Sequence, residues 1–192
     1  MKKILISMVI ILMVYPCLAQ YTYKWGDENY YCPPVKQKYS TWCFYACLSM
    51  LHGLAQATYA TIYCVEFRGE SRITDCSNSF YHKVCTDKGI NRNDAAAFMN
   101  KLFCVVDGVT YGGVYTNIVP VTYLKPGVEY KQFPLLPTIG LEWVGGNYHA
   151  IVLFYIGMSK HGTKNESWEY GYIEPWTGMR KFGYIYNLEI II

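Results

Sequence analysis

The sequence carries little charge, has no repeats or low-complexity linkers, and has no long apolar run after its first residues. Charged residues make up 16% of the 192-residue chain, and the formal net charge is +3. This balance gives no electrostatic basis for binding nucleic acid or anionic lipid, both of which attract strongly basic surfaces. A membrane-spanning helix needs about 20 consecutive apolar residues. We therefore expect a globular protein with no nucleic-acid partner and no stable membrane insertion.

The N-terminus has the pattern of a secretory signal peptide. Two lysines are followed by an apolar run over residues 4–14, interrupted by a single serine, and then by small residues suited to cleavage. We expect residues 1–19 to be removed and residues 20–192 to form one domain, secreted or periplasmic. Lipid attachment at Cys17 is the less favoured alternative, because a proline stands where a small residue is expected.

Removal of the signal leaves an odd number of cysteines. Cysteines tend to pair in an oxidising compartment, so at least one of them is expected to remain a thiol or to bond another chain. The spacing alone does not assign the pairs. The seven cysteines are Cys32, Cys43, Cys47, Cys64, Cys76, Cys85 and Cys104.

A metal site is the alternative for two of these cysteines. The stretch CSNSFYHKVC, residues 76–85, places Cys76, His82 and Cys85 close together in sequence. Zinc takes four ligands, however, and an oxidising compartment favours disulfides. We expect a polar loop held by Cys76 and Cys85, with no metal and no cofactor.

The first half of the chain has three stretches in which apolar residues recur at helical spacing. The first helix is expected to begin with Ser40 or Thr41 as its N-cap and to end at Gly53, a residue that favours helix ends. The other two helices are expected over residues 59–67 and over residues 91–102, the latter with an asparagine cap.

The second half has the pattern of strands. β-branched and aromatic residues alternate between glycines and prolines, which predicts several short antiparallel strands. The predicted fold class is α+β, with a helical lobe over about 37–104 and an antiparallel sheet or partly open barrel over about 105–192. A cleft between two such lobes is where a ligand is expected to bind.

Cys43 differs from the other cysteines in its expected place in the first turn of a helix. Backbone N–H groups at a helix start have no partner within the helix, and the helix dipole is positive there. Both effects favour the thiolate, which is the nucleophilic form of cysteine. Catalysis by such a thiol also needs a base, a group that orients the base, and donors for an oxyanion.

The best placed base is His149, which opens an expected strand. His52 lies on the Cys43 helix but about 13 Å further along its axis, at 1.5 Å per residue, and is too far away. Glu174 ends another expected strand, where its carboxylate can accept an imidazole N–H and hold the ring in one tautomer. Asn147 is the competing candidate for that orienting role.

Two further side chains complete the candidate site. Gln37 stands six residues before Cys43 and can donate its amide to an oxyanion together with the Cys43 backbone N–H. Trp176 follows Glu174 by two residues and can shield its hydrogen bond from water.

Three motifs resemble those of the papain-like cysteine peptidases. QKYSTWC, residues 37–43, resembles the segment in which a glutamine stands six positions before the nucleophile. YHAIVLFYIG, residues 148–157, resembles the strand that begins with the catalytic histidine and an alanine, and EPW, residues 174–176, resembles the asparagine-x-tryptophan element. The resemblance implies these roles: Gln37 as oxyanion donor, Cys43 as nucleophile, His149 as base, Glu174 as its orienting residue and Trp176 as its cover.

The chain departs from that family at three points. Trp42 precedes the cysteine, whereas plant and lysosomal members place a tryptophan after it. Glu174 stands where asparagine is usual, and the segment before Gln37 is too short for a long inhibitory propeptide. With these features the chain is most similar to the compact bacterial secreted and effector members.

The resemblance implies a secreted thiol hydrolase that cleaves amide bonds in peptides or proteins. One alternative keeps the same thiol but acts on peptidoglycan stem peptides, or transfers the acyl group to an amine. Another alternative is a non-catalytic binding protein on a disulfide-stapled scaffold. That alternative predicts that Cys43 is bonded or inert.

Overall fold

The fold is described from a computed structural model of the chain. It covers residues 23–87, 89–103, 105–106, 109–110, 118–121, 136–159, 164 and 166–191. The expected signal peptide and Cys104 lie outside the described residues. Helices and an antiparallel sheet make up the described part, so the predicted α+β class is confirmed.

Helices occupy the region between residues 43 and 103, as predicted. They are α2 (Cys43–His52), α3 (Gln56–Thr61), the π-helix η2 (Ile62–Phe67), the 3-10 helix η3 (Ser79–Tyr81), α4 (His82–Thr86) and α5 (Arg92–Phe103). The single helix expected over 59–67 is therefore an α-helix that continues as a π-helix. The short helix η3 lies between the two cysteines of the expected loop, and α4 contains the second of them, Cys85.

The start of α2 differs from the prediction, and its end agrees with it. Trp42, with φ −98° and ψ 20°, is the N-cap and makes no side-chain capping bond. The prediction of Ser40 or Thr41 as N-cap is wrong, because the Thr41 hydroxyl donates instead to the backbone carbonyl of Thr86. Gly53 ends the helix in the left-handed conformation, and its N–H donates to Ser49 O at 2.9 Å.

The asparagine cap of the last helix is confirmed. Asn91 precedes α5, and its Oδ1 accepts a hydrogen bond from the backbone N–H of Asp94 at 3.0 Å. This bond satisfies one of the N–H groups that have no partner within the helix. Asp94 also places a carboxylate in the first turn, where the helix dipole favours it.

The strands form one large antiparallel sheet and one small one. The large sheet has the order β4-β9-β5-β6-β7-β8, with β1 also paired to β6, and the small sheet is the β2–β3 hairpin. The strands are β1 (Tyr23–Gly26), β2 (Val105–Val106), β3 (Val109–Thr110), β4 (Ile118–Pro120), β5 (Thr138–Val144), β6 (Asn147–Ser159), β7 (Ser167–Glu174), β8 (Met179–Gly183) and β9 (Leu188–Ile191).

The long strand β6 is the centre of the sheet. On one side its first half pairs with β5 and its second half with β1, while β7 pairs along the other side. Both faces of β6 are buried: Ala150, Val152 and Phe154 belong to one core cluster, and residues 151, 153 and 156 belong to the other. A strand buried on both faces has a continuous apolar sequence, which explains the run AIVLFYI.

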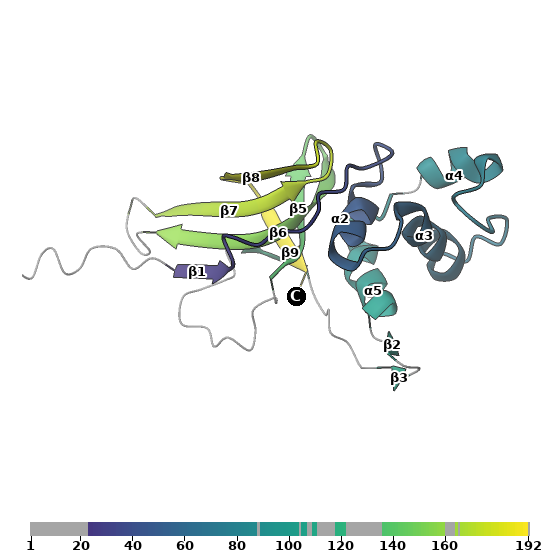
Figure 1. The fold of residues 1–192 in the computed structure, drawn as a ribbon, viewed down its shortest axis with the longest axis horizontal. Helices are drawn as coiled ribbons and strands as arrows, with labels where there is room; N and C mark the ends of the chain where they lie inside the picture. The colour runs from purple at the N-terminus through teal and green to yellow at the C-terminus, as the bar shows by residue number, and fades with distance from the viewer. Residues whose placement is uncertain are drawn as a thin grey trace, which may run out of the picture.

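The helical part packs against one end of the sheet through α2, which contacts β6 (Figure 1). The larger core cluster joins the two parts, because it contains Trp42, Phe44 and Leu48 together with Ile139 and Val152. Burial of these side chains fixes α2 against the sheet. It also sets the start of α2, and with it Cys43, close to the beginning of β6.

Two segments lie apart from the simple order of helices followed by strands. The N-terminal strand β1 is part of the large sheet, and the β2–β3 hairpin lies beside α5 and away from that sheet (Figure 1). No helix among the described residues is long and apolar enough to cross a membrane.

Candidate active site

Cys43 is the first residue of α2 and is partly exposed, so its predicted place in the first helical turn is confirmed. The N-cap side chain makes no capping bond, and the first turn contains no acidic residue. The first intrahelical bond runs from Ala46 N–H to Trp42 O at 2.9 Å. The N–H groups before Ala46 point out of the helix end, where they favour a thiolate or an oxyanion.

The other described cysteines are buried. Cys76 and Cys85 form a disulfide, which confirms the expected bridge of the polar loop. Burial raises the pKa of both the Cys32 thiol and the Cys47 thiol. The charge on Cys43 raises the pKa of Cys47 further. Buried thiols with a raised pKa are poor nucleophiles. Cys43 is therefore, within the described part of the chain, the candidate nucleophile for a substrate that arrives from solution.

His149, the third residue of β6, is hydrogen-bonded to Glu174, the last residue of β7. Its Nε2 lies 2.8 Å from Oε1 of Glu174, and the two side chains are 22% and 11% exposed. Because Nε2 faces Glu174, Nδ1 is the ring nitrogen left for Cys43. Asn147, the alternative orienting residue, is exposed at the start of β6. The residue bonded to Nε2 is thus Glu174.

Hydrogen-bond donors surround the Glu174 carboxylate. Oε1 also accepts the Trp176 backbone N–H at 2.6 Å, while Oε2 accepts the N–H and the hydroxyl of Thr177 at 3.1 and 3.0 Å. The Lys181 ammonium lies 3.6 Å from Oε2. Burial acts to raise the pKa of Glu174, but the bonds from Trp176, His149 and Thr177 outweigh it and lower this pKa. The group is therefore an oriented carboxylate at neutral pH.

The pKa of His149 is raised above its ordinary value of 6.5. Burial of the ring is the largest single influence, and it acts to lower this pKa. Cys43 and Glu174 each raise the pKa through a hydrogen bond and through charge, and their combined effect is larger than that of burial. Of these two groups, Cys43 has the larger effect on the pKa of His149. The charged imidazolium form of His149 is thus favoured beside Cys43 and Glu174.

Gln37 is buried and held through both its backbone and its side chain. Its backbone N–H donates to Pro175 O at 2.8 Å, which ties the segment before α2 to the turn after Glu174. Its Nε2 donates to the carbonyls of Tyr39 and Ser40 at 3.0 and 3.1 Å, and Oε1 has no partner among the described residues. To donate to an oxyanion, Gln37 has to release one of these carbonyls.

Trp176 is more exposed than expected of a covering side chain. It is 55% exposed, and its backbone N–H makes the contact with Glu174 described above. Shielding of the hydrogen bond between His149 and Glu174 by the Trp176 ring is therefore at most partial.

Three residues around this pair were not singled out from the sequence: Glu142, Thr177 and Lys181. Glu142 lies directly opposite His149 in the β5–β6 pairing. Burial raises the pKa of the Glu142 carboxyl, the charge of His149 opposes this rise, and the charge of Glu174 adds to it. The stretch VGGN, residues 144–147, was the available signal, because a two-glycine hairpin turn fixes which residues face each other.

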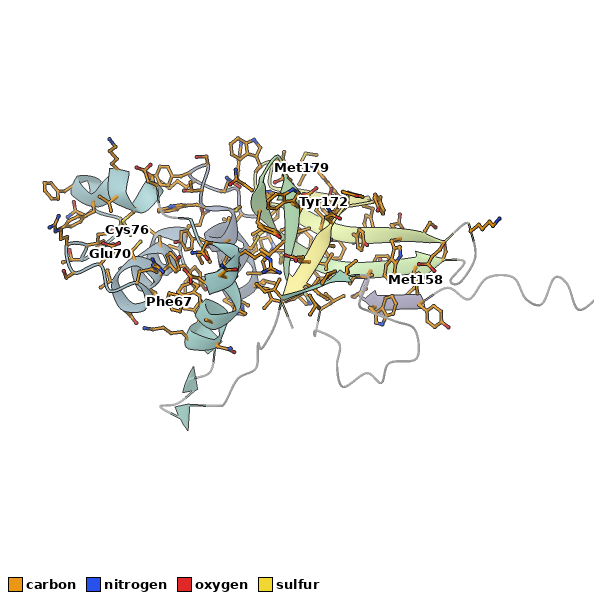
Figure 2. The ribbon with its side chains drawn as sticks, turned by 180° about the vertical axis from the view of Figure 1, so that it is seen from behind. Phe67, Glu70, Cys76, Met158, Tyr172 and Met179 are labelled. Atoms are coloured by element: carbon orange, nitrogen blue, oxygen red, sulfur yellow. A yellow bond between two sulfur atoms is a disulfide. The ribbon has the colours of Figure 1, made fainter. Side chains whose placement is uncertain are left out.

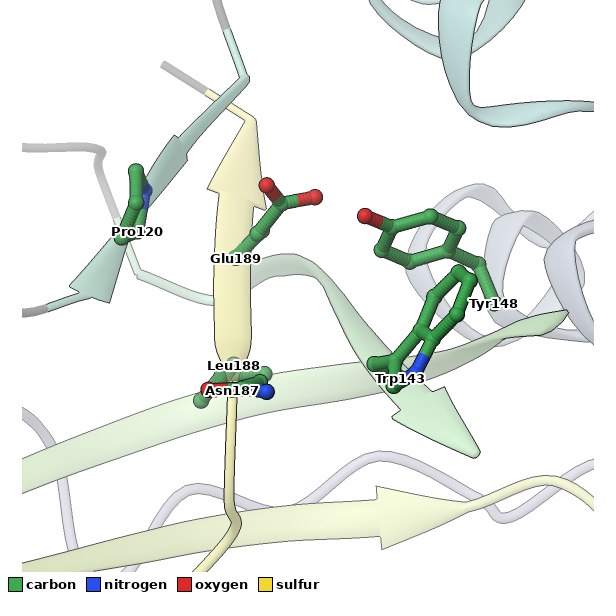
Figure 3. A pocket seen from close by; sticks show the side chains of 6 residues that line it. All are labelled: Pro120, Trp143, Tyr148, Asn187, Leu188 and Glu189. Carbon is green, nitrogen blue, oxygen red and sulfur yellow. The ribbon is translucent and has the colours of Figure 1, made fainter. Parts of the chain in front are cut away.

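A groove of about 320 Å³ begins one residue away from His149. Figure 3 shows Trp143 and Tyr148 on neighbouring strands, with the Glu189 carboxylate directed toward the Tyr148 hydroxyl. Arg92 of α5 binds Glu189 through two hydrogen bonds of 2.6 and 2.8 Å, so the carboxylate is balanced by a guanidinium. The residues that line the groove are Pro120, Trp143, Tyr148, Asn187, Leu188 and Glu189.

Comparisons of the chain with models of protein families, with characterised proteins and with solved structures found no match. A functional interpretation therefore rests on the geometry of the site and on the short motifs in the sequence.

Proposed function

We propose that the protein is a papain-like thiol hydrolase that cleaves amide bonds in peptides or proteins. The observation that carries the proposal is the series of contacts from Cys43, at the start of a helix, through His149 to Glu174. These groups supply the nucleophile, the base and the orienting acid that acyl transfer needs. The packing of α2 against β6 supports a papain-like arrangement of helices and sheet.

The first half of the proposed reaction forms a thioester. The Cys43 thiolate attacks the carbonyl carbon of the substrate, and the carbonyl oxygen becomes an oxyanion. The backbone N–H of Cys43 donates to this oxyanion, and Gln37 contributes once its amide releases a backbone carbonyl. The His149 imidazolium then gives its proton to the leaving amine, so the C–N bond breaks and the neutral amine departs.

The second half releases the acid. Neutral His149 removes a proton from water, which attacks the thioester carbon, and the Cys43 thiolate leaves. Glu174 keeps the ring aligned in both halves, since its carboxylate holds Nε2 and is itself held by Trp176 and Thr177.

The groove lined by Trp143 and Tyr148, the cross-strand pair next to Glu142 and His149, supports a substrate with an apolar side chain. The exposed faces of Trp143 and Tyr148 supply apolar surface, and the ion pair between Arg92 and Glu189 leaves the groove without a net charge. Stem peptides of peptidoglycan remain an alternative substrate class, and an amine remains an alternative acceptor to water. The bridge between Cys76 and Cys85 supports a secreted or periplasmic location, where disulfides persist.

A mixture of defined peptides incubated with the signal-free protein in ¹⁸O-labelled water tests the function. We expect cleavage products that carry ¹⁸O in the new carboxylate, and loss of cleavage in Cys43→Ala. Cys32→Ala is the matched control, because Cys32 is buried and is not among the groups that act on the pKa of His149, and it should cleave like the parent. An added primary amine separates hydrolysis from transfer, since a transferase converts it to an amide without ¹⁸O.

A non-catalytic binding protein predicts a different result. No covalent adduct would form between Cys43 and peptides that carry a thiol-reactive group at the position of the cleaved bond. An enzyme whose substrate is missing from the peptide mixture would still form this adduct at Cys43 with some of the thiol-reactive peptides. The absence of any adduct would contradict the proposed function.

A further inference from the structure

A second group of sulfur atoms lies in the helical part, away from His149. The sulfurs of Cys64, Cys76 and Cys85 all lie within 4.8 Å of one another, and all three residues are buried. Cys76 and Cys85 form the disulfide, and Cys64 lies outside that bond. Figure 2 shows Cys76 among the helices, well separated from the sheet residues Tyr172 and Met158. A third sulfur therefore lies beside a disulfide in the core.

The backbone around Cys64 is unusual. Cys64 is in the middle of η2, a π-helix that continues α3 directly. π-helical turns are rare and occur often at functional sites. The loop with the disulfide is fastened to the same helix, because the Cys76 backbone N–H donates to the Thr61 hydroxyl at 2.8 Å. The helix with Cys64 and the start of the disulfide loop are thus held together.

The other end of the disulfide loop supports the start of α2. The Cys85 carbonyl accepts a hydrogen bond from the Trp42 indole N–H at 3.0 Å, and the next carbonyl, of Thr86, accepts the Thr41 hydroxyl. Trp42 is 1% exposed and directly precedes Cys43. The position of Cys85 is therefore linked through two hydrogen bonds to the residues that precede Cys43.

We propose that Cys64, Cys76 and Cys85 form a thiol–disulfide exchange site behind the start of α2. The Cys64 thiolate attacks one sulfur of the bridge between Cys76 and Cys85. A new S–S bond to Cys64 forms, the old bond breaks, and its electron pair stays on the departing sulfur. That sulfur takes up the proton that Cys64 gave up, so no oxidant or reductant is consumed.

This proposal is independent of the amide-cleaving function. It depends on three sulfurs that are not among the groups acting on His149 or Glu174, and it would stand if Cys43 had no catalytic role. A soft metal ion bound by the three reduced cysteines is the rival occupant, because thiolates bind zinc and similar cations. The structure contains a disulfide at this place, which favours exchange over metal binding.

The test maps the disulfides of the native signal-free chain. Protein held at pH 4 is shifted to pH 6, 7 or 8, quenched with acid and N-ethylmaleimide, digested with pepsin at low pH, and analysed by mass spectrometry. We expect bridges from Cys64 to Cys76 or Cys85 to appear beside the original bridge. The rate of their appearance should rise about tenfold per pH unit, because the thiolate is the attacking form.

Two variants make the result specific. Cys64→Ala should retain the bridge between Cys76 and Cys85 alone, and Cys32→Ala, which removes another buried cysteine, should give the parent's bridges. Circular dichroism confirms that both variants are folded. The proposal is overturned if the parent shows the original bridge alone at every pH, if the new bridges persist in Cys64→Ala, or if the purified chain carries bound zinc that thiol modification releases.

Discussion

The two regions that meet at the candidate site position their side chains in different ways. On the sheet side, Glu174 is held by polar bonds to His149, Trp176 and Thr177. On the helical side, Cys43 is held through the backbone of α2, which packs against β6. Trp42, the residue before Cys43, donates a hydrogen bond to the carbonyl of Cys85. A polar network orients the base, whereas apolar burial and a covalent bridge place the nucleophile.

This difference separates chemistry from stability. Changes on the sheet side should alter the proposed reaction more than the folding, because Glu174 acts on the protonation and direction of His149. Changes behind α2 should alter the folding first, because they affect the core and the disulfide. Substitutions on each side, measured for both cleavage and stability, test this difference.

Removal of the sulfur should have the largest effect. Cys43→Ala is expected to lower the rate of peptide cleavage by about 10⁴-fold or more, because the nucleophile is lost. The melting temperature should stay close to the parent's, since Cys43 is partly exposed. Cleavage rates and thermal melts of the two proteins check this, and retained cleavage would refute the role of Cys43.

Loss of the orienting charge should have the next largest effect. Glu174→Gln is expected to lower the cleavage rate on the order of 10³-fold, because the His149 ring loses its fixed direction and its charged partner. When the cleavage rate of this variant is measured across pH, the loss should appear mainly as a lower maximal rate. Thr177→Val, which removes the hydroxyl but keeps the backbone donor, is the milder companion, and equal losses in both variants would contradict the assignment.

Loss of the disulfide should act mainly on stability. The double variant Cys76→Ala and Cys85→Ala is expected to lower the free energy of unfolding by about 2–3 kcal/mol, since the bridge closes a short loop. Chemical unfolding by denaturant measures this change. Cleavage by the molecules that remain folded should decrease far less than in Glu174→Gln; a larger decrease would show that the loop controls the chemistry.

A smaller effect is expected at the contact between the disulfide loop and α2. Trp42→Phe keeps an aromatic ring but removes the donor to Cys85 O, and it should cost about 1–3 kcal/mol because a buried carbonyl loses its partner. Denaturant unfolding again supplies the measurement. Tyr186→Phe, at an exposed position, is the control and should leave the midpoint unchanged.

The smallest effect concerns pH. The pKa of Glu174 is lowered, so its contribution to stability is present above its ordinary 4.5 and is lost as the pH falls through the folded value. The pKa of His149 is raised, so its contribution is present below 6.5 and is lost as the pH rises through the folded value.

Both contributions are therefore complete between pH 4.5 and 6.5. The free energy of unfolding, measured by denaturant across pH, should be highest in that window. Glu174→Gln should remove the decline on the acidic side more than the decline on the basic side. A parent protein whose stability has no such maximum would contradict the coupling of His149 and Glu174.

The sequence predicted the elements with strong local signals. The helix of Cys43 and its end at Gly53 follow from apolar spacing and a glycine, and the Asn91 cap follows from side-chain chemistry. The start of the Cys43 helix was not predicted correctly, because the Thr41 hydroxyl donates to the carbonyl of Thr86, which is distant in sequence. The strand over 23–26 was also missed, since it exists only through its pairing with β6.

The candidate site shows the same division. Cys43, His149 and Glu174 were predicted from their places at element ends, and the structure brings them together. The donors from Thr177 and Lys181 depend on a tight turn and on the β7–β8 pairing, which residue types alone do not fix. The bonding of Gln37 to nearby carbonyls depends on the loop conformation in the same way.

The most direct test of the central claim is the pH dependence of Cys43 alkylation. Signal-free protein is treated with limiting iodoacetamide between pH 4 and pH 9, and the modified cysteine is identified by mass spectrometry, in the parent and in His149→Ala. We predict labelling at Cys43 that is fast at acidic pH in the parent and slow there in the variant, as expected of a thiolate paired with an imidazolium. Labelling that begins only above pH 8, or that is unchanged in His149→Ala, would contradict the account.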